Sequence, residues 1–270
     1  MDEKLIRHRR NEALGGLMRY QLLGELRVVG SDGDAIPELP RKIRILLTLL
    51  LIGSNRSISR TQLIDQVWDG DPPRRAGAAL HVYVSQLRKH LGDEGGAPLH
   101  TSKSGYRMTT RAGEFDLDVF RGLMLESRAL VDGRRYEEAA AELGSALRLW
   151  RGPALADLQD NAAISGFTAW IDELRAECAA MYVESQCALG AAAKTVGLLR
   201  DLSRQYPLQE IYYRELMRVL HRSGRHAEAL HTYLTARRVF ATRLGVEPGP
   251  VLHEIYCRIL AEDRRSLAAG

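Results

Sequence analysis

The 270-residue chain has no long apolar run and no paired cysteine motif. Its longest apolar stretch, residues 45–52, is broken by Thr48 and falls short of the roughly 18 to 20 apolar residues that cross a membrane. The three cysteines have neither C-x-x-C nor paired histidine spacing, which favours small buried thiols in a reducing compartment. Because no apolar segment follows the charged N-terminus, we expect a cytoplasmic protein that has no membrane partner.

The residue patterns of enzymes and metal sites are also lacking. The eight histidines are scattered, and no serine or cysteine has a recognisable base or nucleophile elbow. Residues 190–195, Gly-Ala-Ala-Ala-Lys-Thr, resemble a phosphate loop only superficially, since the second glycine is missing and no strand precedes them. These absences argue against an enzyme, and we expect neither a cofactor nor a metal site.

Positive charge is concentrated in one part of the chain. The net charge of +4 decides little, but residues 18–111 hold 14 Lys and Arg against 9 Asp and Glu. Residues 112–270 hold 20 against 22. The distribution predicts that the first part neutralises phosphates and that the second part meets protein.

Residues 74–91 show a strong helical pattern. Leucine and valine at positions 80, 84, 87 and 91 form one stripe, which we expect to be buried. The opposite side is polar and basic, and it carries Ser85, Gln86, Arg88 and Lys89, with Arg74 and Arg75 near the start. Such a helix can lie in the major groove of DNA, although the pattern taken alone fits a solvated helix face more often.

The segments around this helix decide between the two interpretations. Strand-like stretches at 20–22, 26–29 and near 35–36 predict a small antiparallel meander, and a core helix follows from Arg41 to about residue 52. Ser59 or Thr61 can cap a second helix that ends at Trp68. After the third helix, residues 99–108 predict a hairpin with Lys103 at its tip. A sheet, three helices and a basic hairpin form a winged helix-turn-helix.

The rest of the chain predicts an all-α, tetratricopeptide-like domain, which makes the fold mostly α. A Gly-Arg-x-x-Glu pattern recurs at 133–137 and 224–228, and Gly190 precedes Gly224 by 34 residues, the tetratricopeptide period. We expect helices at 116–131, 135–149, 163–189, 193–205, 208–222, 226–243 and 248–262, with a non-helical connector at 150–157. The expected divisions are a disordered leader (1–17), a DNA-binding domain (18–111), a helical domain (112–265) and a tail (266–270).

Several motifs resemble one known family across about residues 18–262. Residues 63–73 (LIDQVWDGDPP), 80–88 (LHVYVSQLR) and 104–107 (SGYR) resemble the OmpR/PhoB-type DNA-binding domain of the Streptomyces antibiotic regulatory proteins, a domain type also found as the output domain of two-component regulators. Residues 149–155 (LWRGPAL), 222–225 (RSGR) and 244–249 (LGVEPG) resemble the bacterial transcriptional activator domain of that family. The leader and residues 190–195 depart from the family pattern.

The resemblance implies a transcriptional activator of secondary-metabolite genes. Members bind double-stranded DNA at direct repeats beside the promoter −35 element and recruit RNA polymerase holoenzyme, including its sigma factor. Direct repeats imply two subunits side by side on the DNA. Carried over by position, the DNA-facing residues are Tyr83, Ser85, Gln86, Arg88 and Lys89, with Lys103 and Arg107 at the wing.

Side-chain chemistry divides these residues further. The Gln86 amide can bond adenine N6 and N7 together and is the proposed base reader, whereas Arg88, Lys89 and Lys103 suit phosphates. Arg74 and Arg75 would touch the DNA backbone or polymerase, and Asp69 and Asp71 lie in the loop that would contact polymerase. The alternative is a helical-repeat adaptor whose winged-helix domain is structural and has no specific DNA target.

Overall fold

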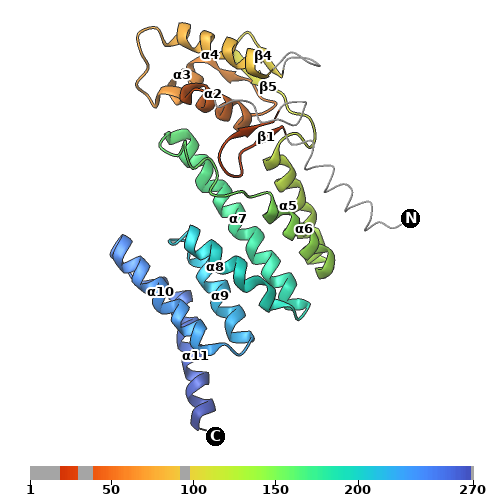
Figure 1. Cartoon of the computed structure of the whole chain (residues 1–270), viewed down its shortest axis with the longest axis vertical. Helices are drawn as coiled ribbons and strands as arrows, with labels where there is room; N and C mark the ends of the chain where they lie inside the picture. The colour runs from red at the N-terminus through yellow and green to blue at the C-terminus, as the bar shows by residue number, and fades with distance from the viewer. Residues whose placement is uncertain (1–18, 30–38, 92–97, 269–270) are drawn as a thin grey trace, which may run out of the picture. The chain divides into compact units, whose positions relative to one another are not determined.

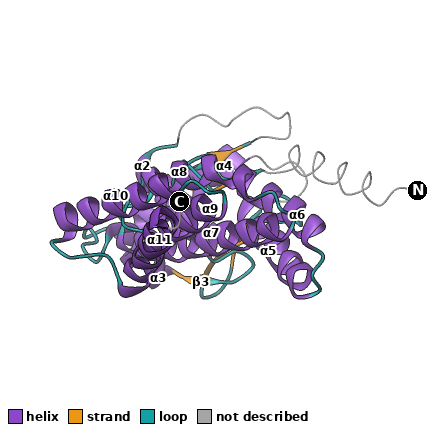
Figure 2. Cartoon of the chain, turned by 90° about the horizontal axis from the view of Figure 1, so that it is seen from below, coloured by secondary structure: helices purple, strands orange, loops and turns teal. Residues whose placement is uncertain are grey.

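The computed structural model describes residues 19–29, 39–91 and 98–268 (Figure 1). Contacts divide the chain into two compact units. Unit 1 comprises residues 1–122 and 148–173, and unit 2 comprises residues 123–147 and 174–270. The predicted leader, the strand near 35–36, most of the loop at 93–98 and the last two residues lie outside the described residues. Figure 2 shows that helices dominate the described chain.

Unit 1 contains the predicted winged helix-turn-helix. Strands β1 (Tyr20–Gln21) and β2 (Arg27–Val28) pair antiparallel, and α2 (Arg41–Ile52), α3 (Arg60–Trp68) and α4 (Ala76–Leu91) follow. Helix α2 is the predicted core helix, since it packs against α3, α4 and the later strand β5 (Gly105–Met108) and buries eight of its residues. Of the two predicted caps for α3, Ser59 is the one used: its hydroxyl accepts from Gln62 N in a capping box.

The predicted hairpin is confirmed as β4 (Leu99–Thr101) and β5 (Gly105–Met108). A short strand that the sequence pattern did not predict, β3 (Ile58–Ser59), pairs antiparallel with β5 to complete a sheet of order β3-β5-β4. A Cβ at position 105 would collide with the carbonyl oxygen of Ile58, so this pairing requires glycine there. The extra strand attaches β5, on the tip side of the hairpin, to the start of α3.

The connector predicted at residues 150–157 belongs to unit 1. As predicted, residues 150–157 are not helical. Arg151 N and Leu155 N donate to the carbonyls of Leu23 and Gly24, and the Trp150 ring packs edge-on to Phe120, with centroids 5.5 Å apart. Arg44 of α2 forms an ion pair with Asp157. These bonds fasten the connector to the β1–β2 turn and to α2.

The remaining elements confirm the predicted helical-repeat domain. They are α5 (Asp116–Asp132), α6 (Tyr136–Arg148), α7 (Ala162–Ala188), the 3-10 helix η1 (Ala192–Thr195), α8 (Val196–Gln205), α9 (Glu210–Arg222), α10 (His226–Leu244) and α11 (Pro250–Ala268). In unit 2, α8 to α11 share one apolar core with the second half of α7. The predicted end of the last helix at residue 262 was wrong, because the following residues are mostly good helix formers and α11 continues to Ala268.

The repeat pattern has a different register from the one read in the sequence. Arg135 donates to both oxygens of Glu138, and Arg225 donates to both oxygens of Glu228. The left-handed residue before each pair is Arg134 (φ 57°) in the first turn and Gly224 (φ 71°) in the second. The equivalent motif is therefore Arg-x-x-Glu, which starts at Arg135 in the first copy and at Arg225 in the second. Aligning Gly133 with Gly224 had placed the start of the first copy one position too early, at Arg134.

Candidate nucleic-acid interface

Helix α4 buries the stripe that the sequence predicted. Leu80, Val84, Leu87 and Leu91 are each at most 3% exposed. The opposite face is open, and it carries the exposed side chains of His81, Val82, Ser85, Gln86 and Lys89. Val82, 52% exposed, lies one turn before Gln86 on this face. The periodicity that placed Gln86 outward also places Val82 there, so Val82 was a predictable member of this face that was missed.

Tyr83 and Arg88 flank this open face and are half-buried. The Tyr83 ring stacks on Trp68 with centroids 5.8 Å apart and an angle of 22° between the planes. Lys42 lies over the other partner of this stack, 5.9 Å from the Trp68 ring centroid, and donates to the Val67 carbonyl. Tyr83 therefore joins α4 to α3 as well as bordering the exposed face.

Two side chains of α4 bond to the hairpin. Arg88 donates to the Leu99 carbonyl at 3.2 and 3.1 Å and to Thr101 Oγ1 at 2.7 Å. About two turns earlier on the helix, His81 Nδ1 lies 2.9 Å from the Tyr106 hydroxyl. Helix α4 and the wing are thus held together at both strands of the hairpin.

Lys103 and Arg107 are exposed on this hairpin, as predicted. The tip also carries a group of hydroxyls: Ser57 Oγ lies 2.7 Å from Ser102 Oγ and 3.4 Å from Ser104 Oγ. Serine hydroxyls and lysine are both common phosphate ligands in protein–DNA complexes. Ser57 comes from the turn before β3, which the sequence pattern did not reveal, so it was missed as a member of this surface.

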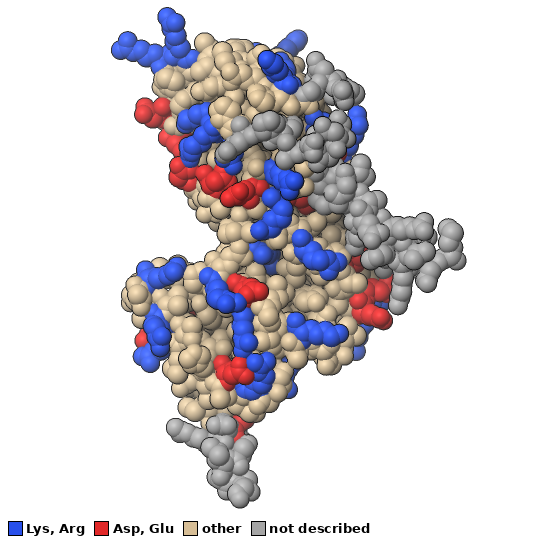
Figure 3. Space-filling model, viewed as in Figure 1, with Lys and Arg blue, Asp and Glu red and all other residues tan. Residues whose placement is uncertain are grey.

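Arg74 and Arg75 are exposed in the turn before α4. The Lys and Arg side chains on the visible face of unit 1 project from its surface in Figure 3, with Asp and Glu side chains also present. The same turn follows the loop of residues 69–73, so two aspartates are followed by two arginines along this short segment.

The two aspartates of that loop have different surroundings. Asp69 has a left-handed backbone (φ 54°), and its Oδ1 accepts from Ala162 N and from Asn161 Nδ2, both at 3.0 Å. Asn161 Nδ2 also donates to the Gln66 carbonyl at 2.7 Å. Asp69 therefore satisfies the N-terminus of α7 within unit 1. Asp71 is exposed, and the structure records no side-chain bond for it among the described residues.

A buried carboxylate supports the base of unit 1. Asp116, at the start of α5, accepts from Leu22 N and Leu23 N at 2.9 Å each. Burial raises the pKa of Asp116 to about 6, although these two main-chain donors and the nearby Arg151 oppose the shift. These two bonds join residues that lie 94 and 93 positions apart in the sequence. They fix the β1–β2 turn on the first turn of α5.

Among the described residues, no group of three or more His, Cys, Asp and Glu side chains is arranged to hold a metal ion. None of the described helices combines the length and the apolar character needed to cross a membrane.

The fold and this surface define a class, the transcriptional regulators that join a winged helix to a helical-repeat domain. Residues 34–108 match the family described as "Transcriptional regulatory protein, C terminal", and residues 115–260 match the "Bacterial transcriptional activator domain". The chain belongs to the Streptomyces antibiotic regulatory protein family, as the resemblance predicted.

Individual relatives agree with this membership. Transcriptional regulator RedD of Streptomyces coelicolor is 32% identical over 92% of this chain and 72% of its own length. Regulatory protein DnrI of Streptomyces peucetius is 29% identical over 91% of this chain and 93% of its own. Transcriptional regulatory protein EmbR of Mycobacterium tuberculosis is 32% identical over 90% of this chain, and the match spans 63% of EmbR.

A solved structure also has the same fold. EmbR of Mycobacterium tuberculosis, in complex with a low-affinity phosphopeptide, superposes with a TM-score of 0.78 at 32% sequence identity. The similarity covers 91% of this chain and 65% of that one.

Proposed function

We propose that this protein is a sequence-specific DNA-binding transcriptional activator that acts by binding rather than by catalysis. The single observation that carries the proposal is the open face of α4, with Gln86 and Lys89 at its centre, beside a hairpin that carries Lys103 and Arg107. An exposed helix face of about this length fits the major groove, and a hairpin fixed beside it reaches the neighbouring backbone or minor groove.

Each residue receives a role from its surroundings. Gln86 reads adenine through its amide, and Val82, one turn away, contacts the methyl group of a thymine. Ser85 and Lys89 on the helix, Lys103 and Arg107 on the wing, and Arg74 and Arg75 before α4 bind phosphates. Tyr83 contacts DNA from the edge of the face. Arg88 donates to the wing through Nε and Nη2, so it can bind a phosphate only through its remaining N–H groups.

The target and partners are those that the family suggests. The protein binds direct repeats beside the −35 element of secondary-metabolite promoters, two subunits side by side, and recruits RNA polymerase holoenzyme with its sigma factor. Asp71 is the better candidate for the polymerase contact, because Asp69 already accepts two bonds from residues 161 and 162. Such a protein would be found with the nucleoid.

Gel-shift titration of the full chain against salt tests the proposal. The DNA would be the promoter regions beside the gene itself, with a scrambled fragment of equal length as the control. We expect specific binding whose log affinity falls linearly with log salt concentration, by about 0.9 for each phosphate contact. A protein that shifts neither fragment, or whose binding shows no salt slope, would instead be the helical-repeat adaptor.

A further inference from the structure

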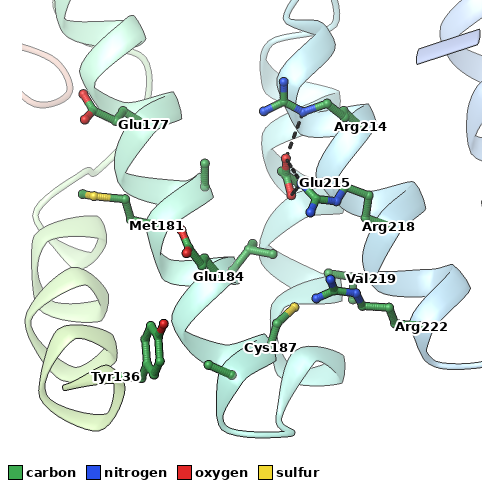
Figure 4. Close-up of a pocket in the computed structure, with 13 residues that line it drawn as sticks. Tyr136, Glu177, Met181, Glu184, Cys187, Arg214, Glu215, Arg218, Val219 and Arg222 are labelled. Carbon is green, nitrogen blue, oxygen red and sulfur yellow. Dashed lines mark hydrogen bonds and ion pairs between the residues drawn. The ribbon is translucent and has the colours of Figure 1, made fainter. Parts of the chain in front are cut away.

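Unit 2 contains a pocket of about 590 Å³ between α7 and α9, with Tyr136 of α6 at one end (Figure 4). This volume lies within the roughly 300 to 1,000 Å³ of small-molecule sites. Small and apolar residues form much of its lining: Ala180, Met181, Val183, Cys187, Ala188 and Val219. The pocket can therefore hold the apolar body of a ligand.

One wall of the pocket is a row of arginines on α9. Arg214, Arg218 and Arg222 are spaced by four residues, so they lie along one face of the helix, as Figure 4 shows. Between them, the Glu215 side chain is only 7% exposed. It accepts from Arg214 Nε at 2.9 Å, whereas Arg218 Nη1 lies at the longer distances of 3.4 and 3.5 Å. Glu215 thus holds Arg214 closely and Arg218 loosely.

The opposite wall, on α7, contributes two carboxylates, and one of them already forms an ion pair within the protein. Glu177 accepts from Arg128 Nε at 3.1 Å and Nη2 at 2.8 Å, a two-point ion pair that raises the pKa of Arg128. Glu184 is exposed, and within the described part of unit 2 its carboxylate has no recorded partner.

Arg222 is the unmatched cation of the pocket. Over the described ranges the structure records no hydrogen bond or ion pair for its guanidinium. A planar guanidinium binds carboxylates through two parallel bonds, and Arg218 one turn away has most of its donors left over. An anion seated between them would lie beside the apolar lining of α7 and Val219.

We propose that this pocket binds a small amphipathic organic acid. Its carboxylate pairs with Arg218 and Arg222, and its apolar body packs on Ala180, Met181 and Val219. The Tyr136 hydroxyl and the Glu184 carboxylate lie on the α6 and α7 side, where they suit a hydroxyl group of the same ligand. Arginines that serve only solubility would attract anions weakly, without one saturable site and without dependence on the apolar lining.

Calorimetric titration of the full chain with 1-naphthoate tests the proposal, and 1-naphthamide is the neutral probe of the same shape. We expect saturable binding of the acid to one site, with the acid preferred over the amide. Arg218→Gln and Arg222→Gln should each weaken acid binding by about tenfold or more, the value of a charge-assisted hydrogen bond, and leave the amide unchanged. Glu184→Gln should tighten acid binding, because it removes a like charge.

Two further variants locate the site. Ala180→Trp fills the pocket and should abolish binding of both probes, whereas Arg238→Gln, which removes an exposed cation from α10, should change neither affinity. Thermal unfolding of each variant verifies that it folds. The proposal is overturned if 1-naphthoate does not saturate the wild-type chain at millimolar concentration, if folded Ala180→Trp binds it equally well, or if acid and amide bind alike.

Discussion

The Arg88 guanidinium on α4 binds the main-chain carbonyl of Leu99 on β4, through Nε at 3.2 Å and Nη2 at 3.1 Å. The same Nη2 also lies 2.7 Å from the Thr101 hydroxyl. A side chain predicted from its position to hold a phosphate is thus engaged inside the protein. Its clearest effect is to position the wing relative to the helix that carries Gln86.

Arg88→Ala should therefore weaken DNA binding by releasing the wing. The same change should destabilise unit 1 by about 1 to 3 kcal/mol, the cost of leaving the buried Leu99 carbonyl without its donor. Affinity measured for Arg88→Ala, Lys103→Ala and the double variant separates positioning from direct contact. If Arg88 positions the wing, the Lys103 effect shrinks in the Arg88→Ala background; strictly additive losses would make Arg88 an independent phosphate contact.

Gln86→Ala should lower affinity for the correct operator by about 1 to 3 kcal/mol and leave non-specific binding nearly intact. The reason is that an amide reads a base edge, while cations supply the sequence-independent part of the affinity. Competitive gel shifts with operators that carry each base at the contacted position would measure this. The matched variant is Lys89→Ala, which changes a residue three positions later on the same face. Its loss of affinity should be similar on all sequences. An equal loss on all sequences for Gln86→Ala would reassign this residue to the backbone.

Lys103→Ala should weaken binding to every sequence and reduce the salt slope by about one unit, since one phosphate contact disappears. Affinity measured at four or more salt concentrations gives the slope. The control is Lys194→Ala, which removes a lysine from η1 in unit 2 and should retain the wild-type slope. Lys42→Ala is unsuitable as a control because Lys42 donates to the Val67 carbonyl. An unchanged slope for Lys103→Ala would remove this residue from the phosphate-binding set.

The two loop aspartates should behave differently. Asp71→Ala should preserve DNA affinity and stability while it reduces transcription in vitro, because the side chain is exposed. Asp69→Ala should also destabilise the protein by about 1 to 2 kcal/mol, the usual cost of removing a helix cap, here the acceptor at the start of α7. Gel shift, urea unfolding and run-off transcription measure the three properties. If the Asp71→Ala variant activates transcription normally, Asp71 is not a polymerase contact. Asp65→Ala on α3 is the control for the loss of one negative charge.

Local patterns explain what the sequence could predict. The stripe of Leu80, Val84 and Leu87 follows the helical period, and the turn residues 102–105 mark the hairpin, so both elements were found with close bounds. The helical repeat was found in the same way.

Contacts between distant residues were not predictable. The bond of Arg88 to Leu99, the cap that Asp69 provides for α7 and the pocket lined from three helices depend on which segments the fold brings together. None of them leaves a periodic signal in one segment. Strand β3 was missed for a related reason, because two residues are too few for alternation to show.

The pH dependence of unit 1 should reflect Asp116. Its pKa rises from 3.8 to about 6 in the folded chain, so between these values the folded state holds more protons than the unfolded state. Stability should therefore fall as the pH rises from about 4 to 6, by up to about 3 kcal/mol, and then stay constant with respect to this group. All three tryptophans, Trp68, Trp150 and Trp170, lie in unit 1, so their fluorescence during urea unfolding reports on it.

Asp116→Asn isolates this contribution. The amide stays neutral throughout, so the fall in stability between pH 4 and 6 should disappear. The variant should also be less stable than the wild type at pH 4, because its NH₂ group faces one of the two main-chain donors, Leu22 N or Leu23 N. The exposed Asp65→Asn should keep the wild-type slope. A wild-type slope in Asp116→Asn would show that other groups cause the pH dependence and that the contact between α5 and the β1–β2 turn does not titrate in this range.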